Sequence, residues 1–451
     1  MIKLADAIRL DKNTRLAFVG GGGKTTAMFQ LARQFETPVI VTTTTHLGTE
    51  QGALADIHFT LADDAPFPDL EKAISENQVV LLTGEPHAGE RLGSIPSRML
   101  AQLKIFVEEK NIPLLIEADG SRKLPIKAPA EKEPVIPGWV NAVVVVVGLS
   151  SVGEPATMET IHRFAHFSKI TGIKAGEAVL FEHIEKLLTH PLGGLKGIPE
   201  DARRMVLLNQ ADDETLTREA ASLADRLVGL YDVVLTASLK PAGRVEGGVS
   251  GVKRCAERIA GIILAAGGAS RYGRPKSLLA WQGETLIRRI VKTALAAGLD
   301  PVVVVLGAAT AAIRAELAGL PVQFVENPMW EQGQSSSLRT GIEVVSAGVC
   351  GGAIMLQADQ PRVPVELLQR EIEHHAGDPV SIVIPRVDGH PSSPVLFDRR
   401  YFDDLLAIKG DQGGRALFEK YPKQWLDWND PTDLMDIDTP EDYQRLLETG
   451  G

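Results

Sequence analysis

The sequence is poor in cysteine, since Cys255 and Cys350 are the only two thiols among its 451 residues. Two cysteines cannot form a disulfide framework or a four-thiolate zinc site. We therefore expect a protein of a reducing compartment, the cytoplasm.

Basic residues are also too few for a general nucleic-acid binder. Lys and Arg number 47 against 58 Asp and Glu, which gives a formal net charge of −11. Nucleic-acid binding needs a basic surface, so this balance argues against a nucleic-acid partner. A small anionic substrate held by a few local cations remains compatible with it.

Long hydrophobic runs are absent as well. The longest apolar stretches, such as Ala142 to Leu149, are far shorter than the ~20 residues that a membrane span needs. The first residues, Met1 to Asp6, lack the apolar core of a signal peptide. We expect a soluble, intracellular protein with no membrane span.

Short β-branched runs alternate with amphipathic segments along the whole chain, which predicts α/β architecture with mainly parallel sheets. The length favours two or three domains. In the first half the predicted strands are Leu16–Gly20, Val39–Thr43, Val79–Thr83, Leu114–Ala118, Ala142–Gly148, Met205–Asn209 and Val233–Ala237. Predicted helices between them include Thr25–Gln34, Pro96–Lys110 and Leu216–Leu227.

A glycine-rich stretch without periodicity, Lys240 to Gly251, is typical of a linker. The alternation then restarts, with predicted strands Gly261–Ala265, Pro301–Leu306, Val322–Glu326, Ala353–Gln357 and Ser381–Pro385. We predict one domain over residues 1–245 and another over 258–451.

The second domain begins with a strand that runs into small residues and then cations. The small residues are Ala265, Ala266, Gly267 and Gly268, directly after Leu264, and the cations are Arg271 and Lys276. Small residues after a strand let backbone N–H groups approach an anion. Donors and cations on one loop suit a triphosphate with a departing pyrophosphate. A plain strand-to-helix turn with two solvated basic residues is the alternative.

This segment resembles the start of the MobA-like nucleotidyltransferases. Leu264-Ala265-Ala266-Gly267, Arg271, Gly273 and Lys276 match the LAAGxSxRxGxxK signature, although Ala269 and Tyr272 depart from the usual serine and methionine. The further matching segments, in order, are Asn327-Pro328, Gln332 to Leu338, Ala358 to Pro361, Gly389 to Pro391, Gly410 to Arg415 and Asp436 to Asp442. The resemblance is strongest to the molybdenum cofactor cytidylyltransferases.

The resemblance implies a Rossmann-like domain and a reaction. CTP and molybdenum-bound molybdopterin would give the cytosine dinucleotide cofactor and pyrophosphate. In this family Ala266, the third residue of the LAAG motif, goes with cytidylyl transfer, whereas LAGG goes with guanylyl transfer. The nucleophile is a phosphate monoester, so catalysis requires orientation and charge neutralisation rather than a general base.

Two carboxylates are candidate Mg²⁺ ligands. Asp359 follows an apolar strand, at the end of the sheet where open α/β sheets bind ligands. Asp438 alternates with Asp436, which predicts that both lie on one face of a short strand. The alternative for Asp438 is a turn that begins the helix after Thr439-Pro440.

Other residues have two open interpretations. Ser337 belongs to a serine run that either caps a helix or contacts the nucleotide, and the resemblance favours the nucleotide contact. His390, Asp411 and Arg415 either bind the second substrate or belong to solvated loops.

The first domain contains a second glycine-rich turn, Gly20-Gly21-Gly22-Gly23-Lys24-Thr25-Thr26, between a strand and a helix. Backbone N–H groups and the helix dipole would face phosphates, Lys24 would add a charge, and Thr25 would offer a hydroxyl to Mg²⁺. The match to a P-loop is imperfect, because Phe18 stands where the motif has glycine. A turn that binds no nucleotide is the alternative.

Three further features bear on this site. Asp119 follows the apolar strand Leu114–Ala118 and is positioned to reach Mg²⁺. Asn209 and Asp212 resemble the guanine-reading element of GTPases, although Gln210 replaces its lysine. Thr42 to Thr45 either face a γ-phosphate or form a polar strand end, and His162 and His166, one helical turn apart, are interpreted as structural.

This half resembles the YqeC-type accessory proteins of selenium-dependent molybdenum hydroxylases, over Phe18–Thr26, Val41–Leu47, Glu117–Ser121 and Asn209–Asp212. The resemblance implies a P-loop-NTPase-like parallel sheet and a step that uses ATP or GTP in maturing an apo molybdenum hydroxylase. Our leading hypothesis is a bifunctional maturation enzyme. The alternatives are a nucleotidyltransferase for a sugar or polyol phosphate and a chaperone that delivers finished cofactor.

Overall fold

The computed structural model describes residues 1–87, 91–240, 251–267, 275–410 and 413–448. The chain divides into two compact units, Met1–Ala256 and Glu257–Gly451. The strand β13 (Gly251–Glu257) follows the predicted linker and is the edge strand of the first sheet. Its Val252 and Cys255 are buried in the core of the first unit, so that unit extends beyond the boundary drawn from the sequence.

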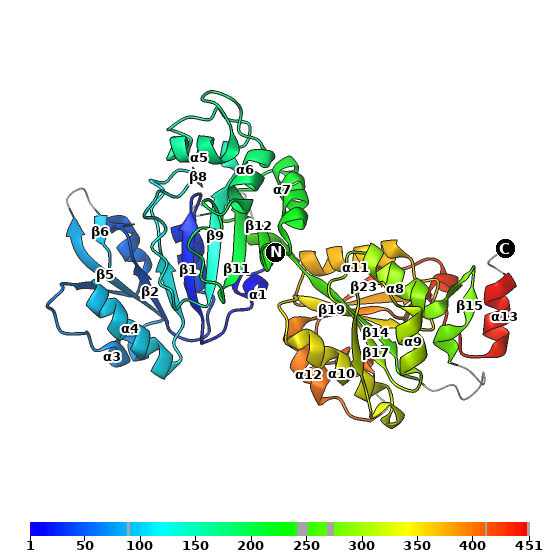
Figure 1. Ribbon diagram of the computed structural model, residues 1–451. Coiled ribbons are helices and arrows are strands. Elements are labelled where there is room, and N and C mark those ends of the chain that lie inside the picture. The colour runs from blue at the N-terminus through cyan, green and yellow to red at the C-terminus, as the bar shows by residue number, and fades with distance from the viewer. Residues whose placement is uncertain (88–90, 241–250, 268–274, 411–412, 449–451) are drawn as a thin grey trace. The chain divides into compact units, whose positions relative to one another are not determined.

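The N-terminal unit is built on one large, mainly parallel sheet with the strand order β13-β12-β11-β9-β1-β7-β2-β5-β6-β3, and β4 pairs with β5 (Figure 1). Its other strands are β1 (Arg15–Gly20), β2 (Val39–Thr43), β3 (Leu47–Gly48), β4 (Ile57–Leu61), β5 (Val79–His87), β6 (Arg91–Gly93), β7 (Leu114–Glu117), β9 (Ala142–Gly148), β11 (Arg203–Asn209) and β12 (Val233–Ser238). The short strands β8 (Ile126–Lys127) and β10 (Ile161–His162) pair separately.

Helices cover both faces of this sheet because its central strands are apolar on both sides. Every residue of β9 is buried, and alternate valines of this strand enter two different cores. One face is covered by α3 (Leu70–Glu76), α4 (Ser97–Lys110), α5 (Phe164–Thr171), α6 (Phe181–Thr189) and α7 (Glu214–Leu227). The other is covered by α1 (Leu4–Ile8) and α2 (Lys24–Ala32).

The C-terminal unit has a mixed sheet with the order β18-β17-β14-β19-β22-β20-β21, and β23 pairs with β20. Its strands are β14 (Ile259–Ala265), β17 (Val302–Leu306), β18 (Gln323–Glu326), β19 (Gly352–Gln357), β20 (Ile382–Val387), β21 (His390–Pro391), β22 (Val395–Asp398) and β23 (Lys423–Asp427), besides the hairpin β15 (Ala280–Trp281) and β16 (Glu284–Thr285). The neighbours β18, β17, β14 and β19 are parallel, whereas β22 runs antiparallel to β19 and β20.

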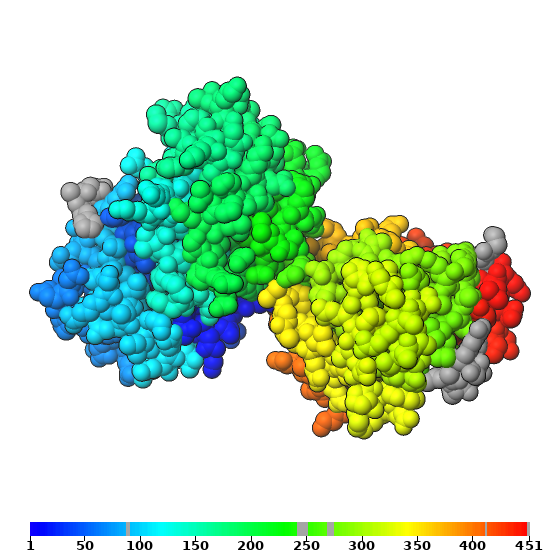
Figure 2. Space-filling model, in the orientation of Figure 1, coloured from blue at the N-terminus to red at the C-terminus, as the bar shows by residue number. Residues whose placement is uncertain are grey.

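The helices of this unit also lie on two faces of the sheet. On one side are α8 (Leu286–Ala296), α9 (Thr310–Glu316) and α11 (Val365–Gly377), and on the other are α10 (Gln334–Ser346) and α12 (Phe402–Ala407). The last helix, α13 (Pro440–Glu448), packs on the β15–β16 hairpin at one end of the unit (Figure 2).

Each strand predicted from the sequence, except the short one at Asp436–Asp438, is present with small shifts at its ends. Each predicted helix also has a counterpart, α2, α4 or α7. The predicted short strand at Asp436–Asp438 is wrong, because this segment has no strand structure and leads into α13.

Candidate functional site

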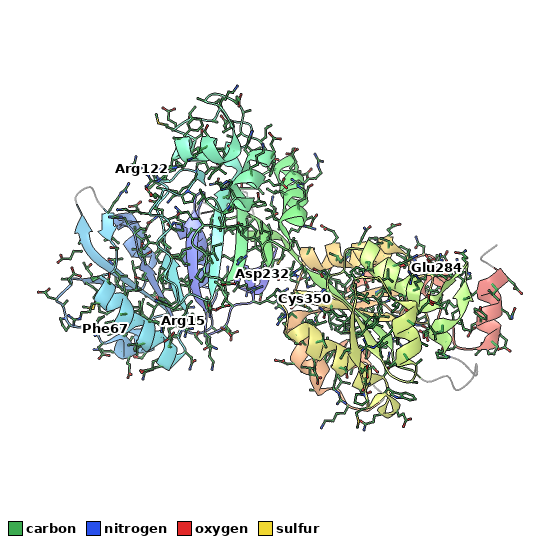
Figure 3. All side chains as sticks on the ribbon, viewed as in Figure 1. Arg15, Phe67, Arg122, Asp232, Glu284 and Cys350 are labelled. Atoms are coloured by element: carbon green, nitrogen blue, oxygen red, sulfur yellow. The ribbon has the colours of Figure 1, made fainter. Side chains whose placement is uncertain are left out.

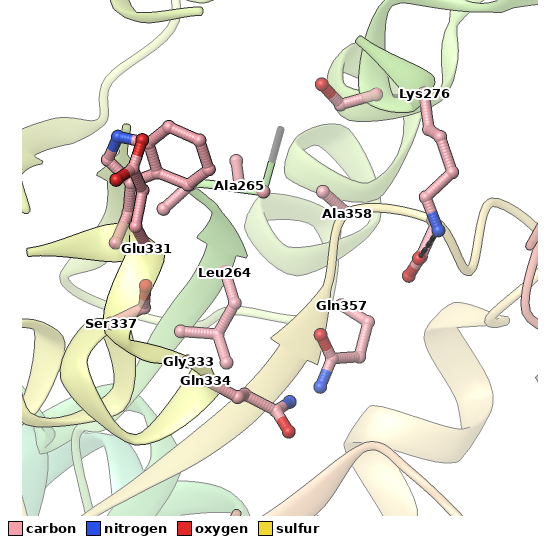
Figure 4. A pocket seen from close by; sticks show the side chains of 14 residues that line it. Leu264, Ala265, Lys276, Glu331, Gly333, Gln334, Ser337, Gln357 and Ala358 are labelled. Carbon is pink, nitrogen blue, oxygen red and sulfur yellow. Dashed lines mark hydrogen bonds and ion pairs between the residues drawn. The ribbon is translucent and has the colours of Figure 1, made fainter. Parts of the chain in front are cut away.

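A cavity of about 400 Å³ lies at the carboxyl ends of β14 and β19 and under the first turn of α10. These strands are parallel neighbours with Leu264 opposite Gln357, so the residues that follow them emerge side by side. Figure 4 shows Lys276 on one side, Glu331 and Ser337 on the other, and Leu264 between them. The lining residues are Leu264, Ala265, Ala266, Gly267, Lys276, Ser277, Trp330, Glu331, Gly333, Gln334, Ser337, Gln357, Ala358 and Asp359.

This cavity brings together most of the residues predicted to bind the nucleotide: Leu264 to Gly267, Lys276, Ser337 and Asp359. An added Cβ on Gly267 would meet no atom of the described residues within 4 Å. Gly268 and Arg271 lie outside the described residues, as does Asp411.

Lys276 links two carboxylates at the edge of this cavity. Its Nζ lies 2.8 Å from Oδ2 of Asp359 and 2.8 Å from Oδ1 of Asp438. Burial alone would lower the pKa of Lys276, but the two carboxylates outweigh it and the pKa is raised. The site therefore already favours a cation between Asp359 and Asp438.

Asp438 reaches this position from a turn rather than from a strand, which is the alternative considered for it. Oδ2 of Asp442 accepts hydrogen bonds from the backbone N–H groups of Asp438 and Thr439, at 3.1 and 2.8 Å. The N–H of Ile437 donates to the carbonyl of Asp359 at 3.0 Å. These bonds fix the entry to α13 against the end of β19.

A third carboxyl, Asp436, completes the acidic cluster. Partial desolvation and the negative charges of Asp359 and Asp438 raise the pKa of Asp436 to about 6. Repulsion among the three carboxylates therefore favours the binding of a proton or a cation by this cluster. Among the described residues, no group of three or more His, Cys, Asp or Glu is arranged to hold a metal ion by itself.

A second cavity of about 520 Å³ adjoins the first and shares Leu264, Gln334, Gln357 and Asp359 with it. Arg415 and the acidic residues Asp436 and Asp438 are part of its lining. His390 lies in β21, is exposed, and lines neither cavity, so its predicted place beside the second substrate gains no support.

Two amide side chains that no single sequence pattern indicates position this site. Asn327 donates through Nδ2 to the hydroxyls of Ser336 and Ser337 at 2.9 and 3.0 Å, which fixes the first turn of α10. Gln360 is buried and donates to Ser393 Oγ and to the carbonyl of Leu434. Both belong to the segments that resemble the nucleotidyltransferases, and that resemblance was the available signal.

The glycine-rich turn of the N-terminal unit joins β1 to α2 and packs tightly on β9. Gly20, Gly22 and Gly23 have φ values of +97°, +81° and +116°. An added Cβ on Gly22 would lie 2.2 Å from the backbone nitrogen of Gly148. Glycine is therefore required here by backbone packing, whatever the turn binds.

Lys24 and Thr25 contact the protein in this turn. Lys24 is buried, and its Nζ donates to the carbonyl of Gly20 at 2.6 Å and lies 3.3 Å from Oδ1 of Asp119. The hydroxyl of Thr25 donates to Oε2 of Glu117 at 2.7 Å. Glu117, which ends β7, is thus the carboxylate beside Thr25, whereas Asp119 accepts from the N–H of Gly20. Burial raises the pKa of Glu117.

Asn209 holds the glycine turn. Its Nδ2 donates to the carbonyl of Gly22 at 2.8 Å, and its Oδ1 accepts from the N–H of Leu239 at 2.9 Å. Asp212 accepts from Ser238 and pairs with Lys240. These contacts give Asn209 and Asp212 structural roles and offer no support for their predicted contact with a nucleotide.

The threonine run is mostly a polar strand end. The hydroxyls of Thr42, Thr43 and Thr44 donate to the carbonyls of Leu82, Glu117 and Val135. The interpretation of His162 and His166 as one helical turn apart is wrong, since His162 lies in β10, before α5 begins at Phe164.

Comparison with known proteins matches each unit separately. The MobA-like NTP transferase domain matches residues 261–425, and the YqeC protein family matches residues 16–165. No helix in the described parts of the chain combines the length and apolar character needed to cross a membrane.

Three curated relatives extend these matches. The YqeC protein of Escherichia coli K12 is 30% identical over 200 residues, 44% of this chain and 76% of the relative. Nicotine blue oxidoreductase of Paenarthrobacter nicotinovorans is 32% identical over 203 residues, 42% of this chain and 96% of the relative. A probable molybdenum cofactor guanylyltransferase of Bacillus cytotoxicus is 26% identical over 200 residues, 42% of this chain and 96% of the relative. The chain therefore belongs to the YqeC family through its N-terminal unit and to the MobA-like NTP transferase family through its C-terminal unit.

Proposed function

We propose that the C-terminal unit transfers CMP from CTP to molybdenum-bound molybdopterin and releases pyrophosphate. One observation supports this most directly: the small residues after β14 and the carboxylate of Asp359 line one cavity. This cavity adjoins a second one that contains Arg415. Two anionic substrates can thus meet at a shared wall, as direct nucleotidyl transfer requires.

The acidic residues fit a Mg²⁺ ion. Asp359 and Asp438 converge on one cation, the ammonium of Lys276. Mg²⁺ prefers one or two carboxylates completed by phosphate oxygens and water, so a triphosphate would supply the missing ligands. A bound Mg²⁺ would orient the α-phosphate and neutralise its charge. Lys276, released from one carboxylate, would then pair with a phosphate oxygen.

The choice of base and acceptor rests on one relative and on one residue of the nucleotide-binding motif. A relative bears the name of a probable molybdenum cofactor guanylyltransferase, which supports a molybdopterin acceptor but names the other base. Ala266, through the resemblance of its motif to cytidylyltransferases, supports CTP. A sugar or polyol phosphate acceptor remains the alternative.

For the N-terminal unit, we propose that the turn of Gly20 to Thr26 binds ATP or GTP during maturation of a molybdenum hydroxylase. Its place between a parallel strand and a helix supports this. Thr25 and Glu117, in hydrogen-bond contact, would hold Mg²⁺. Lys24 would exchange the carbonyl of Gly20 for a phosphate.

Pyrophosphate release tests the transferase. Purified protein with CTP, Mg²⁺ and molybdenum-bound molybdopterin should release pyrophosphate, and GTP should replace CTP poorly. Asp359→Asn should lower the rate by about 100-fold or more. The matched control is Asp403→Asn, at an exposed position on α12. Full activity of Asp359→Asn would refute the metal assignment.

Two further results separate the alternatives. Turnover with a sugar or polyol phosphate and without pterin would favour the other acceptor class. Tight binding of finished cofactor without pyrophosphate release would favour a delivery chaperone. For the N-terminal unit, binding of ATP or GTP should disappear in Lys24→Met, and a protein that binds neither nucleotide would refute that proposal.

A further inference from the structure

The N-terminal unit has a cavity of its own, of about 320 Å³, to which no role has been assigned above. It lies where the chain leaves β2 and β7, at the carboxyl edge of the parallel sheet. Its lining includes Thr45, His46, Arg91, Arg122, His162 and Arg163. Open α/β sheets bind their ligands at this edge.

The charge of this cavity is opposite to that of the whole chain. Three arginines and one glutamate, Glu133, are among its lining residues, in a protein with a net charge of −11. Glu133 already forms a two-pronged bond with Arg163, at 3.1 and 2.8 Å. Arg91 and Arg122 form no ion pair with a carboxylate in the described part of the chain. Two exposed cations are thus available to an anion from solution.

The backbone holds two of these arginines in a costly conformation. Arg122 and Arg163 have φ values of +53° and +63°, in the left-handed region that side chains with a Cβ disfavour. Neither is glycine, asparagine or aspartate, the residues that tolerate this region best. Such positions are enriched at ligand sites, where the surrounding structure imposes them.

A continuous series of ion pairs joins this cavity to the glycine-rich turn. Lys24 pairs with Asp119 at 3.3 Å, and Asp119 pairs with Lys127 at 2.9 Å. Lys127 pairs with Glu133 at 2.9 Å, and Glu133 pairs with Arg163. The side chains of Lys127 and Asp119 are 0% and 2% exposed, so solvent screens this part of the series little.

The series has a physical consequence. If Lys24 turns to a phosphate, Asp119 keeps only Lys127 as its cationic partner, and Lys127 is then drawn away from Glu133. Glu133 would hold Arg163 more strongly in turn.

We propose that this cavity binds the phosphate group of a second, small substrate of the N-terminal unit, through Arg91, Arg122 and the hydroxyl of Thr45. His162 contributes to phosphate binding as a neutral imidazole ring, because burial and the neighbouring Lys127, Arg163 and Arg122 lower its pKa to about 4. Anion binding by this cavity does not depend on nucleotide binding by the glycine-rich turn. Its role as the site of a second substrate rests on the proposed nucleotide binding by the turn.

Phosphate binding by the full-length protein tests the site. Calorimetric titration with inorganic phosphate at low ionic strength should show binding by the wild type that added NaCl weakens, and the part of it that belongs to this cavity is the part that the following double variant removes. Arg91→Gln with Arg122→Gln should weaken binding by about 100-fold, roughly tenfold for each charged hydrogen-bonding partner. The control is Arg218→Gln, at an exposed position on α7. Absence of phosphate binding in the wild type, or equal binding by the double variant, would overturn the proposal.

Two further arms identify the source of the phosphate group and keep the two proposals apart. Phosphate should still bind in the presence of saturating ATP or GTP, whereas competition would show that the cavity takes the nucleotide's own phosphates and would overturn the second-substrate role. In Lys24→Met, loss of nucleotide binding with retained phosphate binding is expected. If the wild type binds phosphate but no nucleotide, the anion site stands and the nucleotide proposal alone fails.

Discussion

At the scale of single residues, the ammonium of Lys276 balances the negative charge of the carboxylates in the C-terminal site. Its ammonium bridges Asp359 and Asp438 at 2.8 Å each. Without it, the two carboxylates and Asp436 would repel one another. In the proposed mechanism a metal ion would displace this ammonium, which would then compete with Mg²⁺ for the carboxylates and, once displaced, would pair with a phosphate oxygen.

Substitution of Lys276 by Met tests these two roles. We expect Lys276→Met to bind Mg²⁺ more tightly, because the competing ammonium is removed, but to transfer nucleotide about 100-fold more slowly. The measurement is the Mg²⁺ dependence of pyrophosphate release. A variant that needs less Mg²⁺ for its half-maximal rate but keeps the maximal rate of the wild type would contradict the catalytic role of Lys276.

The raised pKa of Asp436 gives a second residue-scale prediction. Its pKa is about 6 in the folded protein, against about 3.9 in an unfolded chain. At pH values between about 4 and 6, the folded state binds more protons at this carboxyl than the unfolded state does. The contribution of Asp436 to the free energy of unfolding is therefore complete below about pH 4 and is lost as the pH rises through 6. Asp436→Asn should therefore raise the melting temperature at pH 7.5 relative to the wild type.

The expected gain is less than about 1 kcal/mol, because the side chain remains in contact with water. The measurement is the difference in melting temperature between variant and wild type at pH 4.5 and pH 7.5. An equal difference at the two pH values would show that Asp436 does not titrate between them. Added Mg²⁺ should reduce the difference by neutralising the cluster.

At the scale of elements, the glycine-rich turn of the N-terminal unit is fixed by its fit to β9. Gly22→Ala would place a Cβ 2.2 Å from the nitrogen and 2.3 Å from the Cα of Gly148, both backbone atoms. We expect a loss of about 3 kcal/mol or more in the free energy of unfolding. Gly229→Ala is the matched control, since Gly229 also has a positive φ, +99°, but an added Cβ there has no atom of the described residues within 4 Å.

The control should lose only about 1 kcal/mol, the cost of the left-handed backbone. Urea unfolding of the full-length protein, followed by circular dichroism, compares the two variants. Equal losses would mean that the φ angle alone, and not the packing on β9, makes glycine necessary at position 22.

Element patterns also show how far the sequence could be interpreted. Apolar runs such as Ala142–Gly148 identified buried strands, and parallel strands bring their carboxyl ends together, so Asp359 was predicted at the correct edge. The Asp436–Asp438 alternation spans three residues, which is too short to distinguish a strand from a turn. The pairing of Thr25 with Glu117, rather than with Asp119, depends on side-chain direction at a strand end, which no sequence pattern encodes.

At the scale of the whole molecule, each unit has its own cores, and the division falls at the end of β13, between Ala256 and Glu257. A fragment of residues 1–256 should therefore fold alone and unfold cooperatively. A fragment of residues 1–245 lacks β13, so it would leave the edge of β12 unpaired and remove Val252 and Cys255 from the core. We expect it to be less stable by several kcal/mol, or insoluble.

Comparison of the thermal unfolding of these two fragments measures the contribution of β13. Similar melting temperatures would show that the strand is dispensable and that the earlier boundary, at residue 245, is sufficient. Both fragments are measured at one ionic strength, so that the screening of their surface charges is the same.

The wall that the two C-terminal cavities share has a kinetic and stereochemical consequence. Leu264, Gln334, Gln357 and Asp359 border both cavities, so donor and acceptor would be bound at the same time and no side chain would need to hold the nucleotidyl group in between. Initial rates at varied concentrations of both substrates should then give intersecting rather than parallel reciprocal plots. A chiral thio-substituted α-phosphorus should emerge with inverted configuration, the signature of a single in-line displacement.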